Sequence, residues 1–374
     1  MFTPETISRD FPSLVGKTYL NTAAEGIPPL IVGQALQQYF ADKALGMDGR
    51  EAHFRAEREA REITAYHLGL KPEEVSFCSC SAEAYNLLAS ALALEPEDEV
   101  VINELDFPSG ATPWLADRGR PTVKVWQSVQ GGVTMEHLVP LLGSRTRLVQ
   151  VSLVSFYNGY RLPWAEFLAT VRQHAPQAVV AVDVTQALGR FPLDCQGADI
   201  LISSTHKWTL GIHGGGIVGI PGHAANRLTA RAGGWYHLQN AFNDDRFKRV
   251  EIKPGAASFA TGMPSFAPIY ALNAALRYLA EVGVAQIACH ADPLVVQAYH
   301  GLQELGITPM APFDPGYCSG ILAFRHPNAE AIHRRLHEAN IHVMYHAGRI
   351  RIALHGYNTA NDVTRFLEVL KLAL

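Results

Sequence analysis

Apolar and polar positions along this chain alternate with two periods, one typical of helices and one typical of buried strands. Apolar residues repeat at helical spacing over residues 32–45 and 51–70, and again in a helix that Ser81 or a neighbour caps. Mostly apolar runs of strand length follow at residues 99–103, 122–126, 147–152, 178–183, 199–203 and 216–220. Because helical stretches separate these runs, the pattern predicts an α/β fold with crossover units and a mostly parallel sheet.

The pattern becomes irregular beyond Pro221, where residues 232–262 are rich in Gly and Asn. A long helix is predicted from about residue 268 to 282. The tail from about Pro309 carries predicted strands near residues 320–324 and 350–354, and an amphipathic helix that Asn358 caps or precedes. This part of the chain is expected to form a small C-terminal α+β domain.

Composition narrows the range of functions. The 374 residues are 48% hydrophobic and carry a net charge of −4, without a basic stripe, which argues against nucleic acid and anionic membranes as partners. No stretch is apolar enough to predict a membrane span or a signal sequence. The five scattered cysteines predict reduced thiols in a cytoplasmic protein, and no spacing typical of a metal site occurs.

Two of the predicted strands end in polar side chains of opposite charge. Asp183 follows the run 178–182, and Lys207 lies a few residues past the run 199–203. Carboxyl ends of parallel strands are where α/β proteins place their chemistry. A lysine and a carboxylate suit pyridoxal 5'-phosphate (PLP), whose aldehyde needs an amine and whose pyridinium nitrogen needs an acidic partner. A surface lysine and a helix-capping aspartate would be the alternative.

The residues around this pair carry a family resemblance. Asp183-x-x-Gln186-Ala187 and Ser204-x-His206-Lys207 resemble the two central motifs of the class V aminotransferase family, which includes cysteine desulfurases, kynureninases and isopenicillin N epimerase-like proteins. The resemblance runs from about Tyr19 to the C-terminus.

For the fold, the resemblance implies fold type I, a large domain whose seven-stranded, mostly parallel sheet is flanked by helices, plus the small domain. It divides the chain into an N-terminal segment near the active site (1–30), a large PLP-binding domain (31–265), and an interdomain helix with the small domain (266–374). It also implies a homodimer with shared active sites.

For the cofactor site, the resemblance implies that Lys207 binds PLP and later removes the α-proton, while Asp183 pairs with the ring nitrogen. Gln186 would donate to the phenolate oxygen of the ring, and Ser204 and His206 would contact the phosphate.

Three further segments complete the resemblance. The turn before residues 81–92 would hold the phosphate through the amides of Ser81 and Ala82, although desulfurases usually carry Thr at the second position. Phe107 would stack on the ring where desulfurases carry an acid/base His; a buried core aromatic is the alternative. Trp235, in a segment that reaches the neighbouring subunit's phosphate in relatives, could donate its indole N–H.

Arg351 is the residue that the resemblance selects to bind the substrate carboxylate, because guanidinium matches a carboxylate in a two-pronged fashion. Alternation along residues 349–354 puts Arg349 on the same face, so the pattern alone does not choose between them. Desulfurases carry a catalytic cysteine on a loop before this arginine, and here residues 342–348 contain none. The sequence therefore predicts a PLP enzyme acting on an amino acid or amine, foremost an aminotransferase, then a C–S (β-elimination) lyase, then an epimerase.

Overall fold

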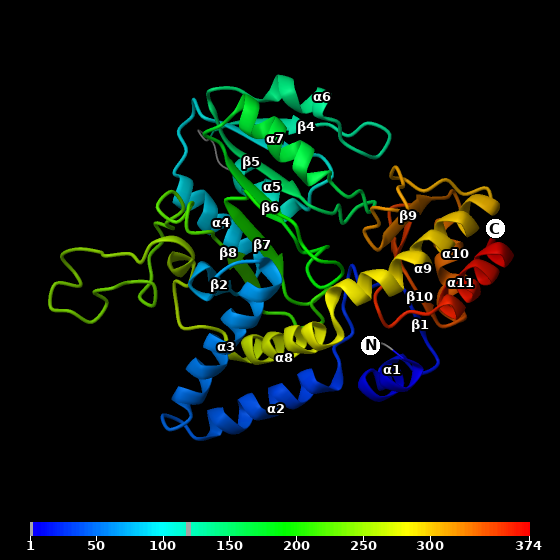
Figure 1. The fold of residues 1–374 in the computed structure, drawn as a ribbon, viewed down its shortest axis with the longest axis horizontal. Coiled ribbons are helices and arrows are strands. Elements are labelled where there is room, and N and C mark those ends of the chain that lie inside the picture. The colour runs from blue at the N-terminus through cyan, green and yellow to red at the C-terminus, as the bar shows by residue number, and fades with distance from the viewer. Residues whose placement is uncertain (1–2, 117–120) are drawn as a thin grey trace.

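A seven-stranded sheet forms the centre of the computed structural model, which describes residues 3–116 and 121–374 (Figure 1). Its strand order is β2-β8-β7-β6-β5-β3-β4. The strands are β2 (Val75–Cys78), β3 (Glu99–Asn103), β4 (Thr122–Trp126), β5 (Thr146–Ser152), β6 (Val179–Asp183), β7 (Ile200–Ser204) and β8 (Gly216–Gly219). The strands from β3 to β7 are mutually parallel, and β8 is antiparallel to both of its neighbours. The predicted fold class is confirmed.

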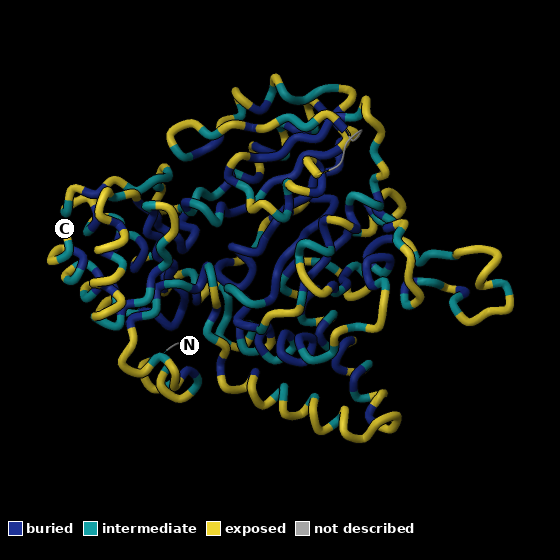
Figure 2. Tube along the Cα trace, turned by 180° about the vertical axis from the view of Figure 1, so that it is seen from behind, coloured by how far each residue is buried: buried dark blue, intermediate teal, exposed yellow. Residues whose placement is uncertain are grey.

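Alternate residues of the central strands belong to two different cores, because both faces of the sheet are covered. Val180 and Val182 pack in one core with residues of α3 (Arg50–Leu68), α7 (Trp164–His174) and α8 (Phe266–Val282). Val179 and Ala181 pack in the other core with residues of α4 (Ser81–Leu92) and α5 (Pro108–Leu115). The buried central strands stand out in Figure 2.

A smaller α/β unit at the C-terminal end has its own core. Strands β11 (Met344–His346), β12 (Arg349–Ala353) and β9 (Ile321–Arg325) form an antiparallel sheet in that order. The helices α9 (Val284–Glu304), α10 (Ala329–Glu338) and α11 (Ala360–Ala373) supply apolar residues to the core of this unit, and Leu20 joins it. The remaining elements are α1 (Pro4–Asp10), α2 (Leu30–Ala44), α6 (Met135–Leu138), and β1 (Thr18–Tyr19) paired with β10 (Ile341–His342).

Two details differ from the sequence expectations, and a third decides between two alternatives. Strand β2 was not predicted, because four residues at the antiparallel edge give too short an alternation. Helix α9 was not predicted as a second helix after α8, from which it departs at an angle of 74°. Helix α11 begins after Thr359, whose side chain accepts a hydrogen bond from Asp362 N, so Asn358 precedes the cap.

The length and hydrophobicity of the helices bear on the expectation that the chain has no membrane span. Within the described residues no single helix is long and apolar enough to cross a membrane. The pair α8 and α9 reaches that length and composition only when its two bent halves are taken together.

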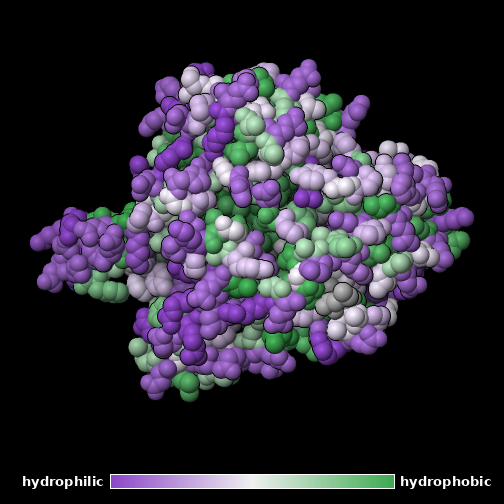
Figure 3. All heavy atoms as spheres, in the orientation of Figure 1, coloured by the Kyte–Doolittle hydropathy of each residue, from purple (hydrophilic) through white to green (hydrophobic). Residues whose placement is uncertain are grey.

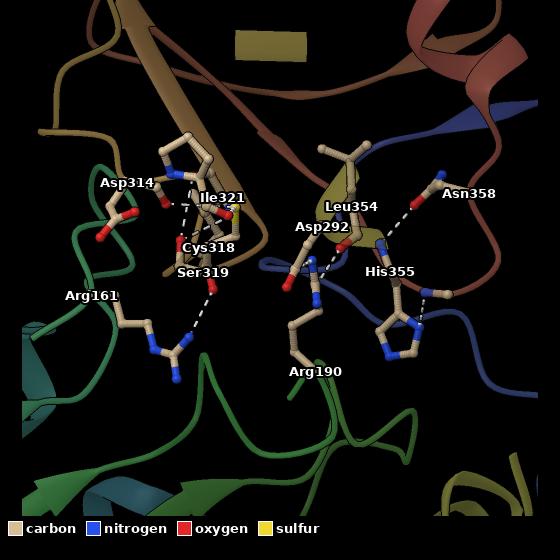
Figure 4. Close-up of polar contacts among 12 residues, drawn as sticks. Arg161, Arg190, Asp292, Asp314, Cys318, Ser319, Ile321, Leu354, His355 and Asn358 are labelled. Atoms are coloured by element: carbon tan, nitrogen blue, oxygen red, sulfur yellow. Dashed lines mark hydrogen bonds and ion pairs between the residues drawn. The ribbon is translucent and has the colours of Figure 1, made fainter. Parts of the chain in front are cut away.

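Buried polar contacts join the large sheet region to the small unit (Figure 4). Arg190 is fully buried, and its Nη2 lies 2.7 Å from Asp292 Oδ1 on α9 while its Nε donates to Leu354 O. Arg161 Nη1 donates to Cys318 O, and its guanidinium lies 3.8 Å from the centroids of the Phe191 and Tyr317 rings. These contacts fix the end of β12 against the carboxyl ends of the large sheet.

Candidate active site

The ends of β6 and β7 bring the two predicted motifs together. The strands are adjacent and parallel, with Asp183 opposite Ile202, so the chain following each strand leaves the same edge of the sheet. A cavity of about 110 Å³ lies there. It is lined by Ser81, Phe107, Ser152, Val154, Phe156, Asp183, Thr185, Gln186, Ser204, His206 and Lys207. Seven of the ten predicted site residues therefore meet in one cavity.

Lys207 has an unusual electrostatic environment. Burial lowers the pKa of its amine to about 8; nearby Asp183 opposes this shift and Arg351 adds to it. Its Nζ lies 5.2 Å from the centroid of the Phe107 ring. A lysine with a lowered pKa has a larger neutral fraction near neutral pH, which is the form that attacks an aldehyde or accepts a proton.

Asp183 is held rigidly by two donors. Its Oδ2 accepts a hydrogen bond of 2.7 Å from the Tyr85 hydroxyl, and its Oδ1 accepts one of 2.8 Å from Thr185 N. Burial, and then the charge of Asp183, raise the pKa of Tyr85, so this hydroxyl stays protonated and donating. Neither Tyr85 nor Thr185 was predicted as a site residue. Tyr85 occupies an apolar position of a helical pattern, where a core residue is the default interpretation.

Gln186 forms hydrogen bonds with two other parts of the chain. Its Nε2 donates to Ala23 O at 3.0 Å, and its Oε1 accepts from Trp208 Nε1 at 2.6 Å. The amide has a second N–H, which is left for the predicted donation to the cofactor ring.

The predicted phosphate turn lies at the N-terminus of α4, where backbone N–H groups and the helix dipole favour an anion. Cys80 is the N-cap residue and Ser81 lines the cavity, whereas the Ala82 side chain does not. Strand β8 lies directly against the turn: a Cβ on Gly216 would come within 2.5 Å of Cys80 C and 3.0 Å of Ser81 N. Any larger residue at position 216 would displace the turn, so the close contact requires glycine.

His206 and Ser204 lie at the other side of the cavity. The His206 ring stacks on His213 with centroids 4.2 Å apart. Burial, the Lys207 charge and then His213 lower the pKa of His206 to about 4, so the ring is neutral at pH 7 and has one N–H to donate. Ser204 Oγ lies 3.4 Å from Thr185 Oγ1. His206, His213 and Glu25 also place three potential metal ligands within 4.8 Å, but Glu25 and His213 are exposed, and we assign no metal to them.

The N-terminal segment packs against the lysine turn. Gly26 N donates to His206 O at 2.8 Å, and a Cβ on Gly26 would lie 1.9 Å from Lys207 O. No side chain is tolerated at this close approach. Gly26 was not singled out from the sequence, although it lies in a Glu-Gly-Ile-Pro turn typical of such a contact.

Arg351, on strand β12 of the small unit, lies beside the cavity. It is buried, its Nη1 donates to Phe156 O at 2.5 Å, and its Nε has no hydrogen-bond partner among the described residues. Burial and the neighbouring Arg349 lower its pKa to about 9. Phe156 lines the cavity and contacts Phe107 with ring centroids 4.9 Å apart. The Arg351 guanidinium is therefore a charged donor beside the cavity whose capacity is only partly used.

Phe107 and Trp235 differ in their positions. Phe107 lines the cavity and is 42% exposed, so the alternative of a buried core aromatic is wrong. Trp235 does not line the cavity of its own chain; its backbone N–H and that of Tyr236 both donate to Thr261 O. The Trp235 segment is thus fixed against Thr261, and the contact of Trp235 with a second subunit remains a prediction.

The donor set fits PLP. An amine of lowered pKa, a fixed carboxylate, a helix N-terminus and an exposed aromatic face meet in one cavity, and an arginine with an unpartnered nitrogen lies beside it. Each corresponds to one chemical group of this cofactor or of an amino-acid substrate. Fold and cavity together define an α/β enzyme of the PLP-dependent type.

Comparison with known proteins gives the family. A family model described as aminotransferase class-V matches residues 18–366. The chain is 28% identical to an uncharacterised aminotransferase of Bacillus subtilis, YcbU, over 98% of this chain and 96% of that protein. It is 27% identical to a probable cysteine desulfurase of Methanothermobacter thermautotrophicus, over 98% and 97% of the two chains. The chain belongs to the class V aminotransferase family, and PLP is its cofactor.

Solved structures share the fold. The cystine C–S lyase C-DES, in complex with its reaction product cysteine persulfide, matches with a TM-score of 0.87 at 21% identity, over 96% of this chain and 99% of that one. At this identity the likeness shows the fold alone.

Proposed function

We propose that this protein is an aminotransferase that acts on an amino acid and a keto acid, with Lys207, Asp183 and Arg351 as its catalytic residues. One observation carries the proposal: Lys207 and Asp183 line one cavity, and Arg351 donates a hydrogen bond to the carbonyl of Phe156, which lines the same cavity. Base, ring partner and carboxylate binder are thus in reach of one cavity.

PLP, when bound, supplies the electron sink for charge that develops at the α-carbon of the substrate. Asp183, fixed by Tyr85 and Thr185, would hold the proton on the ring nitrogen of the bound cofactor. Arg351 orients the substrate by its carboxylate, and the neutral Lys207 amine accepts the α-proton. The Phe107 ring excludes water from one face of the cavity.

The segment before Arg351 argues against a cysteine desulfurase, and transamination is chosen among the remaining reactions as the family-level activity. Strands β11 and β12 form a tight hairpin in which His346 pairs with Arg349, and its turn is Ala347-Gly348, both with positive φ. This turn leaves no room for a loop bearing the desulfurase cysteine. All five cysteines are free thiols and none of them lines the cavity, which argues against persulfide transfer.

A C–S (β-elimination) lyase is the second candidate, supported by the probable cysteine desulfurase among the relatives that match nearly the whole chain. An isopenicillin N epimerase-like activity is third. Removal of the α-proton by Lys207 is common to all three, so they differ only in the fate of the substrate after that step.

We also propose a homodimer with shared active sites and a cytoplasmic location. A segment around residues 235–251 extends away from the body (Figure 1) and bears exposed Phe242 and Phe247 beside many hydrophilic residues (Figure 3). The outer face of α2 is exposed as well (Figure 2) and includes Ile31 and Phe40. Exposed apolar side chains of this size are typical of subunit contacts. Free thiols suit a reducing compartment.

The test of the activity is incubation of the holoenzyme with a panel of amino acids, following cofactor absorbance together with keto acid, pyruvate and sulfide. An aminotransferase accumulates a pyridoxamine form that a keto acid restores. Pyruvate and ammonia without an amino acceptor would favour the lyase instead. Persulfide on any cysteine, formed as fast as alanine is released, would contradict both.

The test of cofactor attachment is borohydride reduction followed by peptide mapping. The label is expected on the peptide that contains Lys207. The Lys207→Ala variant should bind the cofactor only reversibly. A colourless protein that takes up no added PLP would contradict the assignment.

A further inference from the structure

Three arginines of the small unit lie together: the buried Arg349 and Arg351, of which Arg351 contacts a cavity residue, and the exposed Arg325. Arg349 and Arg351 are two residues apart on β12, and Arg325 on β9 is directly opposite Arg349 in the antiparallel register. Like charges directly opposite each other destabilise a sheet. The stability of the sheet therefore does not explain why two arginines face each other here.

The surroundings of these arginines contain no counter-charge in the described part of the chain. Arg349 is 3% exposed, and its Nε and Nη1 have no hydrogen-bond partner. Arg325 donates to Ala347 O and to the Tyr157 hydroxyl. Among residues 3–116 and 121–374, no Asp or Glu lies within salt-bridge distance of any of the three guanidinium groups. Burial without a partner is costly for a cation. The cluster therefore has N–H donors and positive charge left to bind an anion.

The cluster lies one layer of side chains from the cavity. The Arg349 guanidinium carbon lies 4.1 Å from the centroid of the Tyr157 ring and 5.9 Å from that of Phe156. Phe156 lines the cavity and receives a hydrogen bond on its carbonyl from Arg351. Arg351 thus contacts the backbone of Phe156 and Arg349 lies near its ring, so both guanidinium groups are close to one residue of the cavity wall.

We infer that Arg349 binds a second anionic group, at the end of the side chain of an acidic amino-acid or keto-acid substrate, while Arg351 binds the α-carboxylate. Residues i and i+2 of a strand share one face, with their Cα atoms about 6.6 Å apart, so the two arginines are placed to bind one acid that carries two anionic groups. The distal group can be a carboxylate, a sulfonate or a phosphate, since guanidinium binds all of these. The inference rests on the proposed function for Arg351 and adds the substrate class.

Substrate preference is the first measurement. The holoenzyme is assayed with glutamate and aspartate against their neutral amides glutamine and asparagine, and with cysteate and phosphoserine to identify the distal group. We expect kcat/KM for at least one acid to exceed that for its neutral counterpart by tenfold or more. In Arg349→Gln this preference should disappear through a loss on the acids alone. Equal losses on acids and amides, or a preference for the amides in the unaltered protein, would overturn the inference.

Binding without turnover is the second measurement. Succinate and butyrate, one with and one without a second carboxylate, are titrated calorimetrically into the holoenzyme. Succinate should bind at least tenfold more tightly than butyrate, and Arg349→Gln should remove the difference. Arg334→Gln, which changes an exposed arginine of α10, is the matched control and should leave both affinities unchanged.

The two measurements separate failure of the inference from failure of the proposed function. Arg349-dependent succinate binding without any transamination would retain the distal anion site and overturn the aminotransferase. Transamination of neutral amino acids alone, with succinate no better than butyrate, would retain the aminotransferase and overturn the anion site. Arg349→Lys, which keeps the charge but not the planar fork, should restore part of the succinate affinity if the first variant folds poorly.

Discussion

Buried arginines occur in two regions of this molecule, and their charges are balanced in opposite ways. At the junction between the two sheets, Arg190 forms an ion pair with Asp292 and donates to a backbone carbonyl (Figure 4). On β12, Arg349 and Arg351 are similarly buried, but no described carboxylate is near enough to pair with either. The partners of Arg190 are permanent parts of the fold. For Arg349 and Arg351 we propose that a ligand supplies the anionic partner, and this difference would separate a structural arginine from a binding one.

The largest expected effect is on catalysis, from Arg351→Gln. Loss of a buried, charge-assisted contact with the substrate carboxylate should lower kcat/KM by about 100- to 1,000-fold, or about 3–4 kcal/mol, mostly through KM. Cofactor retention, measured by absorbance after dialysis, should be unchanged. If Arg349→Gln instead causes this loss for every substrate, acidic or neutral, the roles within the pair are reversed.

The second effect concerns stability, from Arg190→Gln. This change leaves Asp292 without its partner and should lower the free energy of unfolding by about 1–3 kcal/mol, less than for a fully buried pair because the Asp292 side chain is 34% exposed. KM should change little. Urea denaturation of the holoenzyme measures the first quantity, and Arg334→Gln provides the baseline. A variant of normal stability with a raised KM would place Arg190 among the binding residues.

The same contrast explains how much of the molecule the sequence predicts. The six strands from 99 to 220 were predicted within about two residues, because most of them are buried on both faces and are therefore continuous apolar runs. The two motifs at the ends of β6 and β7, together with Ser81 and Phe107, predicted seven residues that line the cavity. Local sequence patterns therefore predict the strands and the functional side chains that follow them.

Local patterns do not reveal which residues pair across the fold. Tyr85 donates to Asp183 across 98 positions of sequence, and Gly26 packs on the Lys207 carbonyl from the N-terminal segment. Alternation placed Arg349 and Arg351 on one face, but the lack of any carboxylate around them depends on the packing of residues from several elements. The pairing of Arg190 with Asp292 is equally invisible in the sequence.

Arg349→Gln should also change the free energy of unfolding of the protein without substrate. We expect this effect to be smaller than that of Arg190→Gln and opposite in sign. This change removes a buried, unpaired cation that faces Arg325 in the register, and it also loses the contact with the Tyr157 ring. Because the first effect is favourable and the second is modest, the free energy of unfolding should not fall and should rise by up to about 1 kcal/mol. Urea denaturation in buffer free of carboxylates checks this. A loss like that of Arg190→Gln would mean that Arg349 has a structural partner.

The smallest effect is on the pH dependence of cofactor uptake. Burial is the main cause of the low pKa of Lys207, about 8; the Asp183 and Glu25 charges oppose it, and Arg351 strengthens it. Because only the neutral amine attacks the aldehyde, the rate of PLP uptake by the apoprotein should rise as the pH increases through about 8. Arg351→Gln removes a positive neighbour and so stabilises the protonated Lys207 amine. The pH midpoint of PLP uptake should therefore move upward by less than about one pH unit. Arg190→Gln should leave it in place, because the Arg190 charge is paired. Absorbance traces of uptake from pH 6 to 10 measure the midpoint, and a shift in the Arg190 variant equal to that in the Arg351 variant would remove the distinction between the two regions.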